Sequence, residues 1–290
     1  MRAAVELPGG LSLAIADWQR GEGGGEAGDG SGAAPRYPTA QLQKGLLLFA
    51  GGQELAEEGV GFGVPILKRG PQTVFPGRLR LSDPRLGDAW EVTAAFEMNL
   101  VERLATRGGG SVEPRALYAA KDWLAALHRR APGLRRPLAA ASAALRRRLG
   151  WVTTYAEVAP VATLEVTYTV HAEDGLVSVT VAMPGAPAPG VTEVVVMNEL
   201  GARHFRRYED SAGAALQDEE IGTWDEVSAA RASFASAAHR VAFSLGPVAG
   251  SRLYRGRDLV GSRLAWAGFG YSYPPALTRF TYDVKVERHA

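Results

Sequence analysis

The stretch ATLEVTYTVHAEDGLVSVTVAM, residues 162–183, decides the fold class of this 290-residue chain. Apolar and polar side chains alternate through Tyr168 and beyond, which is the period-two pattern of a strand with one buried face. Asp174 and Gly175 follow, and this pair favours a two-residue turn because the turn needs a positive φ. Residues 176–183 then repeat the alternation. The stretch therefore predicts an antiparallel β-hairpin.

The same alternation recurs along most of the chain. Its longest example is WEVTAAFEMNLVERL, residues 90–104. The spacing of its phenylalanine and two leucines also fits a helix, but the Trp-Glu-Val-Thr start favours a strand. Residues 223–238 fit either a capped helix or a loop. Further strands are predicted at residues 11–18, 42–50, 191–200, 241–245, 263–273 and 276–288. Long strands with one apolar face predict a mainly β fold, a single large antiparallel β-sandwich domain over residues 1–290.

Residues 111–150 differ from the rest, because their apolar side chains follow a helical spacing. One stripe runs through Leu117 and Leu127, and a second runs through the leucines after Pro137, so the segment predicts an inserted helical hairpin. Residues 113–150 hold nine cationic and two anionic residues, a net charge of +7, and since the whole chain carries +1 the remainder carries −6. Arginines at helix C-termini suit the helix dipole. They would also dock an acidic partner or a second copy of the chain, and we expect nucleic acid binding less.

Composition excludes several kinds of site. The chain has no cysteine, which rules out disulfides, thiolate metal sites and cysteine nucleophiles. Its five histidines show no metal-ligand spacing, and neither a P-loop nor a nucleophile-elbow motif occurs. We therefore expect no metal and no cofactor.

The sequence also bears on location. No apolar run is long enough to span a bilayer, and a net charge of +1 gives no global attraction to membranes or nucleic acid. The N-terminal residues do not resemble a secretory signal, so we expect a cytoplasmic protein without a membrane partner. Many arginines and few asparagines are typical of a GC-rich prokaryotic genome. Residues 20–36 are rich in glycine and predict a flexible loop.

The most unusual local sequence is GVGFGVPILKRG, residues 59–70. Its alternating glycines do not fit a dinucleotide-binding fingerprint, and Pro65 blocks the helix that should follow. Glycine at every second position leaves one strand face bare, so a ligand or another backbone can approach closely. A bulged edge strand or tight sheet packing is the plainer interpretation. The flanking polar residues that could line a site are Glu57, Glu58, Lys68 and Arg69.

The segment NELGARHFRRYED, residues 198–210, turns polar directly after an apolar strand, as a site at the rim of a sheet would. A histidine beside arginines and carboxylates is competent for acid–base work on a sugar or an anionic substrate. A solvated strand end with surface ion pairs gives the same pattern. The candidates in this segment are Glu199, His204, Arg206, Tyr208 and Asp210.

Two further groups complete the candidates. His171 lies on the polar face of a predicted strand, where an exposed histidine is the plainer interpretation. Tyr271 and Tyr273 share a face just before two prolines, and tyrosine rings can stack on sugars. We expect the neighbouring Trp266 and Phe269 to fill the core instead.

Four stretches, LSLAIADW, QLQKGLLLFAGGQEL, WEVTAAFEMNL and ALTRFTYDVKVE, give a strand pattern that resembles the galactose-mutarotase-like supersandwich superfamily. That superfamily includes aldose epimerases and the sandwich domains of glycoside hydrolases and polysaccharide lyases. The resemblance implies a histidine acid and a glutamate base, for which His171 or His204 and Glu199 or Glu287 are available. No family motif matches residue by residue, and the basic hairpin departs from the family. The GVGFGVPILKRG block resembles one found in uncharacterised prokaryotic proteins, which implies no activity.

Two hypotheses follow. The first is a carbohydrate-handling protein, which binds sugars or acts as a hydrolase, lyase or epimerase in a polar groove of the sandwich. The second is a non-catalytic assembly protein that uses its arginine-rich hairpin to dock an acidic partner or itself as a homo-oligomer. For the first, the candidate catalytic residues are Glu57, Glu58, His171, Glu199 and His204, and the candidate substrate-binding residues are Lys68, Arg69, Arg206, Tyr208, Asp210, Tyr271 and Tyr273.

Overall fold

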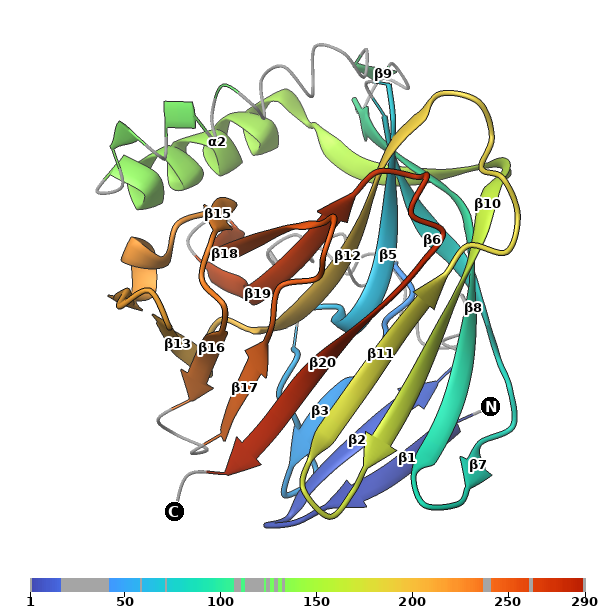
Figure 1. Ribbon diagram of the computed structural model, residues 1–290. Helices are drawn as coiled ribbons and strands as arrows, with labels where there is room; N and C mark the ends of the chain where they lie inside the picture. The colour runs from blue at the N-terminus through green and yellow to red at the C-terminus, as the bar shows by residue number, and fades with distance from the viewer. Residues whose placement is uncertain are drawn as a thin grey trace.

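The computed structural model shows a mainly β protein built from two antiparallel sheets (Figure 1). It describes residues 2–16, 42–57, 59–70, 72–106, 111–112, 123, 126–127, 130–131, 134–236, 241–260 and 263–288. The predicted glycine-rich loop at residues 20–36 and the candidate Glu58 lie outside these ranges. The predicted antiparallel β fold is confirmed, and the extent of a single domain stays a prediction.

The smaller sheet has the order β1-β2-β3-β4, with strands Arg2–Leu7, Leu11–Ala16, Leu47–Ala50 and Gln53–Glu54. The larger sheet begins with β14 (Ala215–Gln217), β13 (Phe205–Asp210), β16 (Ala232–Ser236), β17 (Val241–Leu245), β20 (Arg279–Arg288), β11 (Leu176–Ala182), β10 (Val152–His171) and β8 (Trp90–Ala105). It continues with β6 (Gln72–Leu81), β5 (Gly61–Arg69), β12 (Val191–Gly201), β19 (Arg263–Tyr273), β18 (Arg252–Val260) and β15 (Asp225–Val227). Two short strands, β7 (Arg85–Leu86) and β9 (Ser111–Val112), pair with β8.

The larger sheet folds over on itself, so that its two halves face each other as the layers of a sandwich. Phe62 on β5 packs edge-on against Phe243 on β17, with ring centroids 5.7 Å apart. Phe269 on β19 packs in the same way against Phe234 on β16, at 4.9 Å. Contacts between strands from opposite halves of the strand order require this folding. Figure 1 shows the resulting layers, with the smaller sheet at one end.

The alternating sequence explains which face of each strand is buried. In β10 and β11 the apolar positions, such as Val166, Tyr168 and Val179, are fully buried, while the threonines between them are partly exposed. The predicted hairpin between the two strands is confirmed, and Gly175 adopts a φ of 69° in its turn. One buried face per strand gives the two layers a shared hydrophobic core.

The predicted helical hairpin is not supported. The structure describes one helix there, α2 (Arg135–Leu149), which begins two residues before the expected Pro137. The expected partner helix around Leu117 lies mostly outside the described residues. Directly after α2, β10 begins at Val152, well before the predicted start at residue 162, because its first half pairs with the far end of β8.

Two other segments are now placed. Residues 223–238, left between helix and loop by the sequence, form the short strands β15 and β16 instead. The glycine-rich block forms β5, which is not an edge strand because it lies between β6 and β12. Tight packing explains its glycines: at Gly63, with φ of 78°, a Cβ atom would sit 2.7 Å from the Tyr168 hydroxyl of the opposite layer.

Candidate functional site

Glu57 and His204 form a direct pair although they are distant in the sequence. Oε1 of Glu57 lies 3.1 Å from Nε2 of His204. His204 belongs to the turn between β12 and β13, and its imidazole is 6% exposed, while the Glu57 side chain is 24% exposed. Since a carboxylate only accepts hydrogen bonds, the imidazole donates from Nε2. Arg203 adds a cationic group, with its Nη1 3.7 Å from the same carboxylate oxygen.

The backbone of Glu57 is held in an unusual conformation. Its φ is +48°, in the left-handed region that residues with a side chain rarely adopt. The ammonium of Lys44 donates to the Glu57 carbonyl at 2.9 Å and forms an ion pair with Glu54 at 2.6 Å. Strained backbone held by surrounding contacts is common at functional sites.

A second carboxylate, that of Glu199, lies near this pair. Glu199 is 6% exposed on β12, and its Oε2 accepts a hydrogen bond of 3.4 Å from the amide of Val60. Two positions further on, the Cα of Gly201 faces the Glu57 side chain, because a Cβ there would meet Cγ and Oε2 of Glu57 at 3.1 Å. Glu57, Glu199 and His204 therefore gather around the end of β12.

The other candidates do not join this cluster. Lys68 and Arg69 lie at the opposite end of β5, since Gly61 pairs with Glu199 whereas Lys68 pairs with Glu193. Seven strand positions correspond to about 23 Å. Lys68 donates to Thr73, and Arg69 donates to the carbonyl of Pro189.

His171 is exposed at the last position of β10, beside the hairpin turn. Glu287 is exposed near the end of β20 and pairs in register with Ala242. Of the histidines and glutamates that the family resemblance offers, His204 and Glu199 are thus the two that lie near the end of β12, where His204 contacts Glu57.

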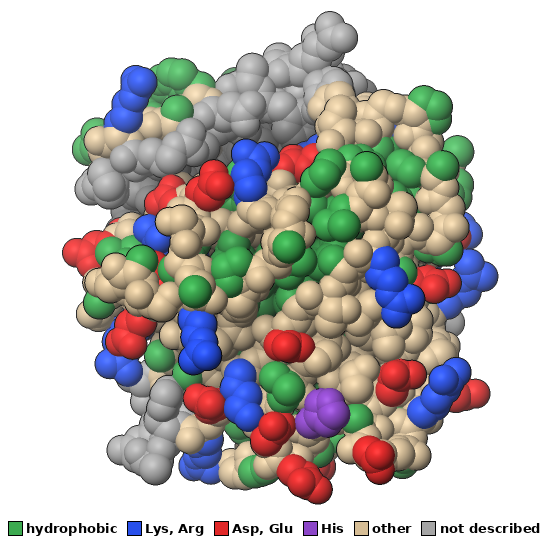
Figure 2. Space-filling model, viewed as in Figure 1, with side chains coloured by type: hydrophobic (Ala, Val, Ile, Leu, Met, Phe, Trp, Pro, Cys, Tyr) green, Lys and Arg blue, Asp and Glu red, His purple; other side chains and the backbone are tan. Residues whose placement is uncertain are grey.

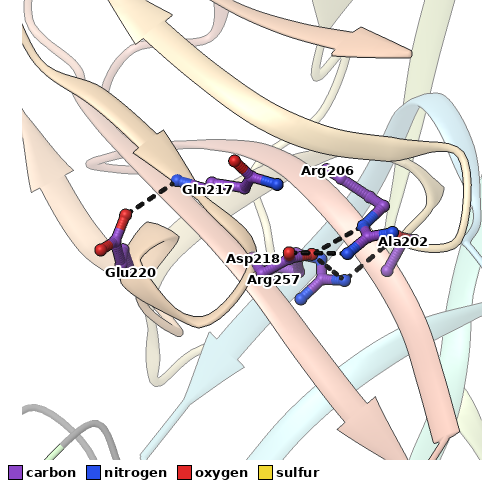
Figure 3. A network of polar contacts seen from close by, with 6 residues as sticks. All are labelled: Ala202, Arg206, Gln217, Asp218, Glu220 and Arg257. Carbon is purple, nitrogen blue, oxygen red and sulfur yellow. Dashed lines mark hydrogen bonds and ion pairs between the residues drawn. The ribbon is translucent and has the colours of Figure 1, made fainter. Parts of the chain in front are cut away.

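Arg206, a predicted binding residue on β13, belongs to a different network (Figure 3). The guanidinium of Arg206 donates two hydrogen bonds to Asp218, at 2.9 and 2.8 Å. Arg257 of β18 is 1% exposed and lies 3.1 Å from the same carboxylate, and it also donates to the carbonyl of Ala202. Asp218 opens the short 3-10 helix η3 (Asp218–Ile221). This network joins β13 to β18, which lie near opposite ends of the strand order of the folded sheet.

The charge of Asp218 is stabilised by these arginines. The hydrogen bonds from Arg206 lower the pKa of Asp218 below its ordinary value, partial burial opposes them, and the charge of Arg257 lowers the pKa further. The arginines therefore favour the ionised carboxylate. It acts as an anionic bridge between two strands rather than as a proton donor.

The tyrosine candidates are core residues in the structure. Tyr208 is fully buried and donates to Asp210 at 2.8 Å, and burial raises its pKa. Tyr271 and Tyr273 are 0% and 3% exposed, so the structure does not place them where a sugar could stack. The β13 and β19 positions of these three rings face the interior of the sandwich.

Trp266 and Phe269 are both buried, as the sequence predicts, at 7% and 0% exposed. They lie three positions apart on β19 and so point to opposite faces. Trp266 packs on the outer face against Trp224, with ring centroids 6.3 Å apart. The alternation of side chains along a strand is enough to predict that Trp266 and Phe269 lie on opposite faces.

Sequence reasoning missed Lys44 and Glu54. In QLQKGLLLF a single lysine precedes an apolar run, and one such residue gives no periodic pattern from which a contact could be predicted. Within the described ranges, no group of three histidine or acidic side chains could hold a metal ion. No helix in the same ranges is both long and apolar enough to cross a membrane.

No protein-family model matches the chain, and no curated protein matches it. Among solved structures, an Escherichia coli K12 protein proposed to be an aldose 1-epimerase is 9% identical, with 100% of both chains covered and a TM-score of 0.42. The Slr1438 protein from Synechocystis sp. PCC 6803 is 9% identical, with 97% of this chain and 93% of that one covered and a TM-score of 0.39. Heparinase III is 8% identical at a TM-score of 0.38, with 95% of this chain but 33% of heparinase III covered. These likenesses are weak, and the activity is inferred from the chain's own residues.

The Asp218 network makes stability depend on pH. A lowered folded-state pKa contributes stability above the ordinary aspartate value of about 3.9, and this stability is lost as the pH falls through the folded value. We expect Asp218→Asn to lower the free energy of unfolding by about 2–4 kcal/mol at pH 7, because it leaves the buried Arg257 without its anionic partner. The difference from the unsubstituted protein should shrink as the pH is lowered towards 3.

Urea unfolding at a series of pH values measures both effects. Asp83→Asn is the matched control, because Asp83 is exposed on the connection between β6 and β7, and we expect it to change stability by less than about 0.5 kcal/mol. A loss for Asp218→Asn that is the same at pH 7 and at acid pH would contradict the anionic bridge.

Proposed function

We propose that this chain handles carbohydrates, and that it does so by acid–base chemistry on a sugar at Glu57, His204 and Glu199. The observation that supports the proposal most is the Glu57–His204 pair, with its 3.1 Å separation. An imidazole oriented by a carboxylate is a common arrangement for moving a proton near neutral pH. The proposal rests on these residues and on the family resemblance of the strand pattern.

The hydrogen bond between Glu57 and His204 determines which tautomer the imidazole adopts. Because Nε2 donates its proton to Glu57, the neutral ring carries its lone pair on Nδ1. The imidazole would accept the proton of the anomeric hydroxyl as the sugar ring opens and return it when the ring closes. Glu57 would stabilise the imidazolium that forms in between, as an oriented carboxylate does for a histidine base.

Glu199 supplies the second group that such a reaction needs. Ring opening of an aldose and its reclosure require one group that takes a proton and another that gives one. Glu199 is 6% exposed near the same end of β12, and Arg203, whose side chain is 77% exposed, adds a cation at the rim. We therefore favour an epimerase-like reaction at the anomeric carbon over simple binding.

The direct test is the exchange rate between the α and β anomers of a panel of aldoses, followed by NMR or polarimetry. We expect the protein to accelerate exchange for at least one aldose. Glu57→Gln and His204→Asn should each lower kcat about 100-fold or more, because general acid–base groups contribute about 10²–10⁴.

His171→Asn is the matched control, since His171 is exposed at a different strand end and should leave the rate unchanged. Equal rates for His204→Asn and the unsubstituted protein would remove the assignment. Absence of acceleration and of binding for the whole panel would remove the carbohydrate proposal itself.

A second candidate function, self-assembly, is favoured by one observation on α2. Leu145 and Leu149 are 52% and 44% exposed on this helix, and Leu134 just before it is 51% exposed. Figure 2 shows hydrophobic side chains at the surface where α2 lies, at the upper left. The helix sequence holds five arginines and no acidic residue, so a second copy with net negative charge outside this region would complement it.

Light scattering at low and high salt tests this candidate. If α2 mediates self-association, the protein is dimeric or larger at low salt, and Leu145→Ser combined with Leu149→Ser shifts it to the monomer. High salt should weaken the association, because screening reduces the attraction between the charged surfaces. A monomer at every ionic strength would contradict the assembly role.

A further inference from the structure

We propose that Lys44 is a positioning residue that holds Glu57 in the conformation from which its carboxylate meets His204. The inference rests on the proposed function, because it gives Lys44 a role at that same cluster. Lys44 does not contact His204 itself, and it acts through the Glu57 backbone. None of the sequence patterns pointed to it.

Lys44 contacts both Glu57 and Glu54 through its ammonium group. Its ammonium donates to the Glu57 carbonyl at 2.9 Å, and the Glu54 carboxylate at 2.6 Å fixes the ammonium from the other side. The Lys44 side chain is 19% exposed, which limits the alternative positions of its charged end. The lysine therefore ties the loop before β5 to the short strand β4.

Glu57 needs such a tie because its backbone is in the left-handed region. Without restraint, a glutamate would leave a φ of +48° for an ordinary helical or extended value. A change of φ at Glu57 rotates its Cα–Cβ bond and carries the carboxylate away from the imidazole. Lys44 donates a hydrogen bond to the carbonyl oxygen of Glu57, so it restrains the same residue whose backbone has the positive φ.

The Glu57 side chain lies against the Cα of Gly201, where a larger residue would have its own side chain. A Cβ at Gly201 would meet Cγ and Oε2 of Glu57 at 3.1 Å, and the Gly201 amide donates to the Leu55 carbonyl at 2.8 Å. The segment that carries Glu57 thus packs against β12 at Gly201, and Lys44 holds its backbone at Glu57.

A purely electrostatic role for Lys44 makes the opposite prediction for His204. Removing a cation near the cluster would make protonation of the imidazole easier and raise its pKa. Loss of positioning moves the Glu57 carboxylate away and lowers the His204 pKa instead. Two other charged groups of the described residues lie near the pair, Arg203 on the β12–β13 turn and Glu199 on β12, and both are unchanged in both cases.

The experiment is an NMR titration of the imidazole signals in the full chain, which needs no substrate. The variants are Lys44→Met and Glu57→Gln, singly and combined, with Glu54→Gln as the control that removes the ion pair but keeps the Lys44 ammonium. The exposed His171 in the same spectra reports whether each variant is folded and gives an internal reference. If Lys44→Met does not fold, Lys44→Gln takes its place.

We expect Glu57→Gln to lower the His204 pKa by about one pH unit, since a carboxylate within hydrogen-bond distance favours the charged imidazole. Lys44→Met should lower it by a similar amount, the double variant should add nothing further, and Glu54→Gln should have a smaller effect. A His204 pKa that is unchanged or raised in Lys44→Met overturns the inference. If Glu57→Gln itself leaves the His204 pKa unchanged, the Glu57–His204 pair and the proposed function fail, which distinguishes the two outcomes.

Discussion

Two tyrosine hydroxyls reach across the sandwich and bond the layers to each other. Tyr168 of β10 donates to the carbonyl of Phe62 on β5 at 2.8 Å, and Tyr282 of β20 donates to Oδ1 of Asn198 on β12 at 2.7 Å. The same Oδ1 accepts from the amide of Gly63 at 3.1 Å. These groups are buried, so each bond lost would leave an unsatisfied polar atom in the core. The bonds fix which strands face each other and how closely the layers approach.

Strand pairing within one layer determines where the candidate site lies. β5 and β12 are antiparallel neighbours in the larger sheet, so the loop before β5 meets the turn after β12. Glu57 and His204 come together across 147 sequence positions for that reason. The folding of the sheet brings β13 near β18, and the Arg206–Asp218–Arg257 bridge joins them next to the same turn. The site therefore depends on strand pairing within a layer, and the bridge depends on the folding of the sheet.

Strand alternation predicted the mainly β fold and the hairpin at residues 162–183, because side-chain parity is a local property. The same alternation places Trp266 and Phe269 on opposite faces of β19. The sequence predicts Glu57, Glu199 and His204 as candidate residues, but their meeting depends on the pairing of β5 with β12, which no local pattern predicts. Burial of Tyr271 and Tyr273 depends on the opposite layer. The helical hairpin is not supported, because its expected first helix around Leu117 lies mostly outside the described residues. Lys44 was not predicted, because a single lysine gives no periodic pattern.

The close approach of the two layers at Gly63 is the central claim, and one comparison of unfolding free energies tests it. Gly63→Ala and Gly52→Ala both introduce a side chain at a φ near 80°, but a Cβ at Gly52 meets nothing within 4 Å, whereas at Gly63 it meets the Tyr168 hydroxyl at 2.7 Å. Urea unfolding should show that Gly63→Ala loses about 1–3 kcal/mol more than Gly52→Ala, the cost of forcing packed layers apart. Equal losses for the two variants would contradict the layered closure.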